Sequence, residues 1–187
     1  MPAGRGIRAV AVCVVSSADR VFVVRNYDPV KGEIYYRPLG GGIEFGEHSR
    51  DAVLREFREE IGADLENVRR LCTLENIFTL EGELAHEIVQ VYEARFADES
   101  WYAAPPLPVR DSPEVALWKP LGAFVDGERL VPEGLLEMII CSYADSAGSL
   151  WTTTLKEAPS GIAARSWLKI AHCSLPASYQ TPTGCSL

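Results

Sequence analysis

The sequence lacks several features that would assign a protein of 187 residues to a class at once. Its five cysteines are odd in number, widely separated and without the spacing of a zinc site, so we expect reduced thiols rather than a disulfide framework. It also lacks an excess of positive charge, because its formal net charge is −8. Stable binding to nucleic acid or to an anionic membrane is therefore not expected, whereas small phosphorylated substrates carried with a cation remain compatible.

Long apolar runs are also scarce near the N-terminus. The run at residues 9–15 follows Arg5 and Arg8, but it is too short to span a membrane and no clear cleavage pattern accompanies it. We therefore expect a cytoplasmic location and no membrane partner. The length and the 47% hydrophobic content suit one domain with a single sizeable core.

The most informative segment is residues 41–63, which combines a glycine turn with several carboxylates. We predict a helix over residues 50–61, because Ser49 can cap its first amides, Asp51 suits its first turn and Gly62 can end it in a left-handed conformation. At about 100° per residue, one arc beside the apolar stripe of this helix carries three carboxylates, Glu56, Glu59 and Glu60.

Three acids on one arc require a compensating positive charge. Arg55 can pair with Glu59 one turn later, but one guanidinium cannot neutralise all three acids. Mg²⁺ and Mn²⁺ prefer oxygen ligands, and Mg²⁺ commonly joins one or two carboxylates to substrate phosphates. The spacing therefore predicts a divalent metal site that serves phosphate chemistry.

The full pattern is Gly41, five residues, Glu47, seven residues, then Arg55-Glu56-Phe57-Arg58-Glu59-Glu60-Ile61-Gly62-Ala63. It resembles the Nudix box of the Nudix hydrolase family at every defining position. The resemblance is strict over residues 41–63, looser over residues 6–143 and absent beyond them. One departure precedes the box: many members have Pro-Gly-Gly, where this chain has Pro38-Leu39-Gly40.

Strand patterns occur at residues 7–15, 21–25, 35–39, 71–80, 86–96 and 115–118, and a second helix fits residues 132–143 with Pro132 in its first turn. This order indicates an α/β protein with helices on both faces of a mixed β-sheet. The resemblance likewise implies the α/β/α sandwich of the Nudix fold. We assign residues 1–143 to this domain.

Residues 144–187 form a C-terminal extension to which the sequence assigns no role. Few of its residues are charged, and serine and threonine are frequent. Residues 162–170 are predicted to dock on the domain or on a second subunit, and residues 174–187 are predicted to be loose coil.

The resemblance implies a metal-dependent pyrophosphohydrolase that cleaves a nucleoside diphosphate linked to another moiety, with water attacking phosphorus. It implies Mg²⁺ (or Mn²⁺) held by Glu59 and Glu60, joined by Glu56 and the Gly40 carbonyl. Glu56 is either a third ligand or the proton acceptor. Glu47 and Arg55 hold the loop and helix together, and Glu47 is a further candidate for the metal.

Some relatives take another carboxylate from a later loop, for which Glu114 is favoured over Glu87. The catalytic set predicted from these roles is Arg55, Glu56, Glu59 and Glu114.

Candidates for substrate binding precede and follow the box. Arg37 can reach a phosphate from the strand that leads into the glycine turn. A nucleobase needs an aromatic or apolar platform, which Tyr35, Tyr36, Phe78 or Trp101 can supply. Of these we predict Tyr36 and Phe78.

The substrate remains open between nucleoside triphosphates and ADP-ribose-like molecules. The alternative is a Nudix-fold nucleotide sensor or scaffold without turnover, and the intact set of box acids argues against it. Homodimerisation is expected by resemblance alone.

Overall fold

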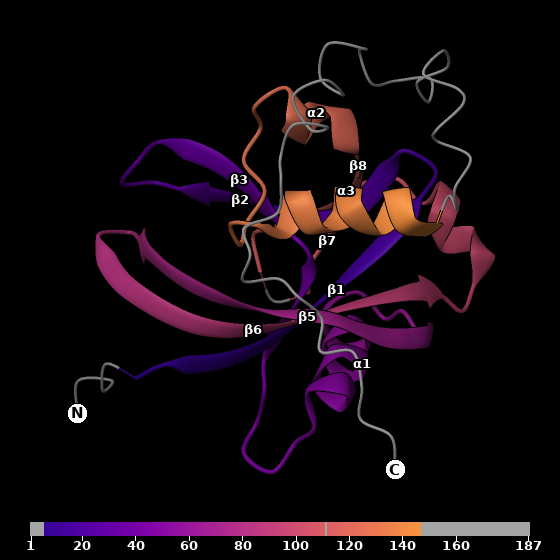
Figure 1. Ribbon diagram of the computed structural model, residues 1–187, viewed down its shortest axis with the longest axis horizontal. Coiled ribbons are helices and arrows are strands. Elements are labelled where there is room, and N and C mark those ends of the chain that lie inside the picture. Colours follow the sequence, from indigo (N-terminus) through magenta and orange to yellow (C-terminus); the bar gives the residue numbers. More distant parts are fainter. Residues whose placement is uncertain (1–5, 111, 147–187) are drawn as a thin grey trace.

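The centre of the computed structural model, which describes residues 6–110 and 112–146, is one eight-stranded sheet (Figure 1). Its strands are β1 (Arg8–Ser17), β2 (Arg20–Asp28), β3 (Glu33–Arg37), β4 (Leu39–Gly42), β5 (Leu65–Leu80), β6 (Glu83–Phe96), β7 (Leu107–Pro108) and β8 (Val115–Pro120). They follow the order β5-β6-β1-β2-β8-β7, with β3 on β2 and β4 on β1. Only the β1–β6 pair of this described sheet is parallel, so the predicted mixed sheet is confirmed.

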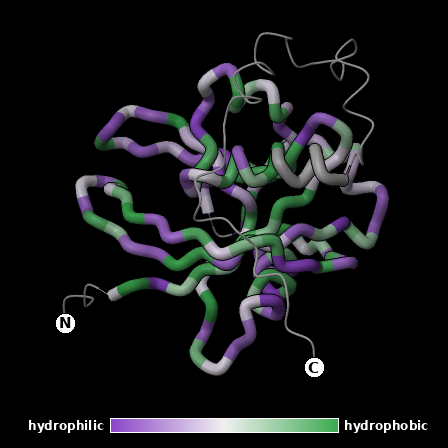
Figure 2. Tube along the Cα trace, viewed as in Figure 1, coloured by the Kyte–Doolittle hydropathy of each residue, from purple (hydrophilic) through white to green (hydrophobic). Residues whose placement is uncertain are grey.

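Helices cover both faces of this sheet. Helix α1 (Ser49–Glu60) lies on one face, and α2 (Leu121–Val125) and α3 (Leu135–Ser146) lie on the other (Figure 1). Strand β1 serves both layers because successive residues of a strand point to opposite faces. Ala11 and Cys13 are buried with Phe57 of α1, whereas Val10 and Val12 are buried with Leu135 of α3. Figure 2 shows the resulting band of apolar residues along the middle of the molecule.

Strands β1 and β2 diverge, and this divergence positions the site. They pair with each other only where residues 15–17 of β1 face residues 20–22 of β2. Beyond that point β4 pairs with residues 10–13 of β1, and β3 pairs with residues 24–28 of β2. The chain from β3 to β4 therefore fills the fork between the two central strands, which sets the glycine turn beside β1.

Helix α1 begins and ends within one residue of the predicted limits, but its N-terminus differs from the prediction. The capping position belongs to His48, whose side chain makes no capping bond, and the hydroxyl of Ser49 instead lies 2.6 Å from that of Tyr92. The C-terminus agrees with the prediction: Gly62 has a φ of 76°, and its N–H donates to the Arg58 carbonyl at 3.1 Å.

Other boundaries differ for local reasons. Strand β5 begins at Leu65 rather than at residue 71, because its polar first part pairs with β6 through irregular register at Glu66/Arg69 and Arg70/Cys72. Helix α3 begins at Leu135, so Pro132 precedes it instead of occupying its first turn. Helix α2, which has five residues, was not predicted.

Helix α3 also continues past the predicted domain boundary at residue 143. The predictions for residues 162–170 and 174–187 lie outside the described residues. In the described ranges, no helix combines the length and apolar character needed to cross a membrane.

Gly40 makes the close approach of β4 to β1 possible, and replacing it is expected to destabilise the fold strongly. A Cβ at this position would lie 2.2 Å from the Ala11 carbonyl oxygen and 2.8 Å from Val12 Cα, and the backbone φ is 140°. Because the obstructing atoms are backbone, we expect Gly40→Ala to lower the free energy of unfolding by about 3 kcal/mol or more. Urea denaturation measures this loss.

Gly42→Ala is the matched control, because a Cβ there would meet nothing within 4 Å. It should keep stability within about 0.5 kcal/mol of the parent. Equal stability of the two variants would contradict the proposed role of Gly40.

Candidate active site

Arg55 of α1 holds the acidic residues of the box in fixed positions. Its Nε and Nη2 donate to the two carboxylate oxygens of Glu47 at 2.9 and 3.0 Å, and Nη2 also donates to the Gly42 carbonyl at 3.0 Å. Its Nη1 donates to Glu56 at 2.9 Å and to Glu59 at 3.0 Å. All five N–H groups of the guanidinium are therefore used. The predicted Glu47–Arg55 pair is present and is bidentate.

Electrostatics in this cluster follow from the same contacts. The hydrogen bonds from Arg55, together with the Glu44 amide, hold the pKa of Glu47 below its ordinary value. In turn, Glu47 first, and then Glu59 and Glu56, raise the pKa of Arg55 further, so the guanidinium stays charged. The glycine turn and the helix are thus joined by charge-assisted hydrogen bonds.

Glu60 is the acid that Arg55 does not reach. Its Oε2 is the one buried side-chain polar atom within the described residues that has no hydrogen-bond partner. Burial raises the pKa of Glu60 to about 7; Arg37 and the Gly40 amide oppose the rise, and the charges of Glu56 and Glu114 add to it. A desolvated carboxylate oxygen without a donor is suited to bind a cation.

The residues present fit a divalent cation, although the acids differ in whether their side chains line the cavity. Glu56 and Glu60 both line the cavity described below, and a carboxylate pair of this kind suits a hard cation that also binds phosphate. The side chain of Glu59 is 60% exposed and turned to Arg55. In the described part of the chain, no three His, Cys, Asp or Glu side chains are grouped closely enough to hold a metal ion among themselves. Phosphate oxygens or a rotated Glu59 would therefore have to complete the set.

Arg37 and Glu114 meet beside these acids. Nη2 of Arg37 donates to Glu114 Oε2 at 2.9 Å, and Nη1 donates to the Gly40 carbonyl at 3.0 Å. The structure thus brings together three of the predicted site groups: Arg37 of β3, the Gly40 carbonyl of β4, and Glu114 just before β8. The Gly40 carbonyl, predicted as a metal ligand, accepts from a guanidinium here.

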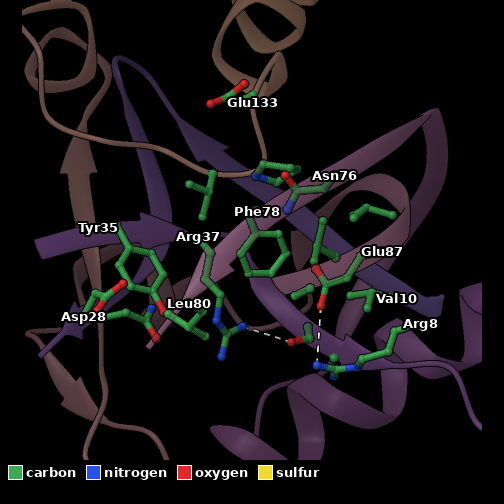
Figure 3. A pocket seen from close by; sticks show the side chains of 18 of the residues that line it. Arg8, Val10, Asp28, Tyr35, Arg37, Asn76, Phe78, Leu80, Glu87 and Glu133 are labelled. Atoms are coloured by element: carbon green, nitrogen blue, oxygen red, sulfur yellow. Dashed lines mark hydrogen bonds and ion pairs between the residues drawn. The ribbon is translucent and has the colours of Figure 1, made fainter. Parts of the chain in front are cut away.

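These groups line a cavity of about 520 Å³, a size suited to a single small-molecule ligand (Figure 3). Its floor comes from the forked centre of the sheet, and its sides come from the β2–β3 and β5–β6 hairpins. Apolar and aromatic side chains also line the cavity, among them Val10, Val12, Tyr35, Phe78, Leu80 and Val131.

Tyr36, predicted as a substrate-binding residue, does not line this cavity. Its ring packs against Phe124 at a centroid distance of 5.5 Å, and Lys119 Nζ lies 4.8 Å from the ring centroid. Adjacent strand residues face opposite sides of the sheet, so Tyr35 faces the cavity with Arg37 while Tyr36 faces α2. Phe78 does line the cavity. Trp101 stacks on Phe96 in the core.

Several polar residues that line the cavity were not predicted from the sequence, and one was only a second choice. Glu87, the weaker carboxylate candidate, lines the cavity and pairs with Arg8 at 3.4 Å (Figure 3). The missed polar residues include Asn26, Asp28, Lys31, Asn76, Arg129 and Glu133. Asn26 and Asp28 lie two residues apart near the end of β2, so their side chains point to the same face of the sheet, and both are buried.

Comparison with known proteins agrees with this architecture. The sequence model described as the NUDIX domain matches residues 6–134. A curated relative, the RNA pyrophosphohydrolase of Novosphingobium aromaticivorans, is 39% identical over 77 residues, which cover 40% of this chain and 47% of that protein. The chain thus spans about half the length of this relative.

Solved structures show the same fold. A NUDIX hydrolase from Nitrosomonas europaea superimposes with a TM-score of 0.54 at 14% identity, over 75% of this chain and 90% of that chain. The mutator MutT protein from Bacillus halodurans gives a TM-score of 0.50 at 20% identity, over 74% and 82% of the two chains.

The contacts of Arg55 predict an unequal effect of the same substitution at two positions of α1. Arg55→Lys keeps the charge but cannot reproduce five hydrogen bonds, so we expect the free energy of unfolding to fall by about 2 kcal/mol. Arg58→Lys is the control, because Arg58 makes an exposed pair with Asp64 and the change should cost less than about 0.5 kcal/mol. Thermal and urea denaturation measure both, and similar losses would contradict the special role of Arg55.

Proposed function

Because the chain belongs to the Nudix pyrophosphohydrolase family, we propose that it hydrolyses the diphosphate of a nucleoside diphosphate linked to another moiety, using the cavity between the two hairpins. The observation that carries the proposal is the partnerless buried oxygen of Glu60 beside Glu56, at the glycine end of that cavity. Mg²⁺ or Mn²⁺ bound there would neutralise phosphate charge and make an adjacent phosphorus more electrophilic.

In the proposed reaction the oxygen of a water molecule forms a bond to one phosphorus, and the bond from that phosphorus to the bridging oxygen breaks. The products are two phosphomonoesters, or pyrophosphate and a monoester when the substrate is a triphosphate. The attacking water gives up a proton, and Glu56 is our candidate to accept it, since it lines the cavity one turn before Glu60.

The remaining residues orient the substrate. Arg37 can exchange its contacts with Glu114 and the Gly40 carbonyl for a phosphate oxygen, because it lines the same cavity as Glu56 and Glu60. Arg55 acts as a positioning residue that fixes Glu56 and Glu59. Tyr35 and Phe78 supply aromatic surface for a nucleobase.

Two substrate classes deserve direct comparison. Small nucleotides, such as nucleoside triphosphates and ADP-ribose-like molecules, suit the size of the cavity. The name of the curated relative, RNA pyrophosphohydrolase, adds RNA as a second class, and the diphosphate bonds of such a substrate lie in its 5′-terminal triphosphate. We propose to measure the phosphomonoester and pyrophosphate products formed from both classes, and from dinucleoside polyphosphates and nucleotide sugars, with and without Mg²⁺ or Mn²⁺.

Metal-dependent turnover in that panel would establish the enzyme. Binding of nucleotides without any turnover, by protein shown to be folded, would favour the sensor alternative.

Glu60→Gln tests the metal site directly. The amide preserves the shape of the side chain and removes the desolvated charge, so the protein should fold, while metal-dependent turnover should fall by about a hundredfold or more. Binding of Mn²⁺, followed by electron paramagnetic resonance, should weaken in parallel.

Glu66→Gln, a change at an exposed position of β5, is the control and should alter neither quantity. Unchanged turnover in Glu60→Gln, or in Glu59→Gln, would show that our assignment of the ligands is wrong.

A further inference from the structure

The tips of the two hairpins that form the sides of the cavity are joined by a bridge of polar contacts. Asp28 ends β2, and its Oδ1 accepts from the amides of Val30 and Lys31 at 2.9 and 3.1 Å within its own turn. The amide of Glu81, in the β5–β6 turn, helps to lower the pKa of the Asp28 carboxyl. Lys31 Nζ donates to the carbonyl of Thr79 and lies 3.6 Å from Asp28 Oδ2.

The Asp28 carboxylate at the centre of this bridge is buried and hydrogen-bonded. The Asp28 side chain is only 4% exposed, and a buried carboxylate with several donors is a costly arrangement unless each contact is kept. Burial opposes its ionisation, but the amides of Lys31, Val30 and Glu81 and the charge of Lys31 hold the pKa of Asp28 below its ordinary value. Glu81 and Gly82 both have positive φ, which turns the β5–β6 hairpin in two residues.

The bridge lies at the edge of the cavity. Asp28, Lys31, Thr79 and Leu80 all line it, whereas Glu56 and Glu60 line its glycine end. Figure 3 shows Asp28 and Leu80 next to Tyr35, with Arg37 between this group and the pair of Arg8 with Glu87. A ligand whose phosphates lie near Glu60 and Arg37 and whose base reaches Tyr35 and Phe78 is thus enclosed on the side of the hairpin tips.

The charged residues around the bridge also disfavour a polynucleotide ligand. Every cationic residue that lines the cavity, within the described part of the chain, is paired with a carboxylate: Arg8 with Glu87, Lys31 with Asp28, Arg37 with Glu114 and Arg129 with Glu33. The exposed residues at the hairpin tips and the cavity rim include Glu33, Glu81, Glu83 and Glu133. A polynucleotide backbone leaving the cavity here would meet negative charge without unpaired cations, which disfavours its binding.

We propose that the bridge from Asp28 and Lys31 to Thr79 and Glu81 limits the cavity to a substrate of one-nucleotide size and rejects the 5′ end of an RNA chain. Asp28 and Lys31 are therefore specificity-determining residues. This inference rests on the proposed function, because it takes the cavity as the site of a nucleoside diphosphate group.

The test compares binding of two probes to wild-type protein, Lys31→Met and Lys119→Met. One probe is a nucleoside triphosphate with methylene in place of the bridging oxygens, and the other is a short oligoribonucleotide with the same modified 5′-triphosphate. Calorimetry in Mg²⁺ gives both affinities without any turnover. Lys119→Met is the matched control, because Lys119 pairs with Glu128 and does not line the cavity.

We expect the wild type to prefer the mononucleotide by about tenfold or more, which corresponds to about 1.4 kcal/mol. Lys31→Met should reduce this preference about tenfold, because opening the hairpin tips admits the oligonucleotide although the net charge there becomes more negative. Amide hydrogen exchange at Val30, Lys31 and Glu81 should become faster in Lys31→Met and stay unchanged in Lys119→Met.

Equal binding of both probes by the wild type would overturn the inference, and so would an unchanged preference in Lys31→Met. Loss of mononucleotide affinity alone in Lys31→Met would also overturn it, by indicating that the lysine contacts the ligand. The proposed hydrolysis is judged separately by metal-dependent turnover. A selective but inactive protein would refute the proposed function, whereas an active but unselective protein would refute only the role of the bridge.

Discussion

The five hydrogen bonds of Arg55 are the constraint on which the rest of the site depends. A guanidinium is planar, so fixing one edge on the Glu47 carboxylate also fixes where its remaining N–H groups point. Those groups then orient Glu56, Glu59 and the Gly42 carbonyl. The glycine turn, the helix and the acids are thereby one rigid unit, and Phe57, fully buried on the opposite side of α1, anchors that unit in the core.

Charge balance explains why the remaining acid differs from its neighbours. Arg55 satisfies the acids on its own side, whereas Glu60 faces the cavity with Arg37 as a partial counter-charge. Arg37 is itself shared with Glu114 and with the Gly40 carbonyl. The negative charge of Glu60 is therefore only partly compensated, in contrast to that of the acids paired with Arg55. This asymmetry suits a site that gains both a cation and a phosphate group together.

The box could be interpreted from sequence because its contacts are local: the spacing of Glu47, Arg55 and the helical acids contains almost all of the geometry. The two central predictions, the mixed sheet and the helix within one residue of its limits, follow from patterns within short windows. The choice between Tyr35 and Tyr36 could not be made that way, since it depends on which face of β3 meets the cavity. The Asp28–Lys31 bridge was equally inaccessible, because it joins turns about 50 residues apart through tertiary contacts.

The parallel pairing of β1 with β6 has a consequence for how the chain reaches this structure. Arg8 is the register partner of Glu87, so these two neighbouring strands are separated by 79 positions in the sequence. The loss of entropy in closing such a long segment precedes the gain from the pairing, which makes folding slow compared with that of proteins built from local contacts. The β5–β6 hairpin closes through a two-residue turn and can form first, providing β6 as a template for β1. We therefore expect the pairing of β1 with β6 to form late, although β1 is the first strand of the chain.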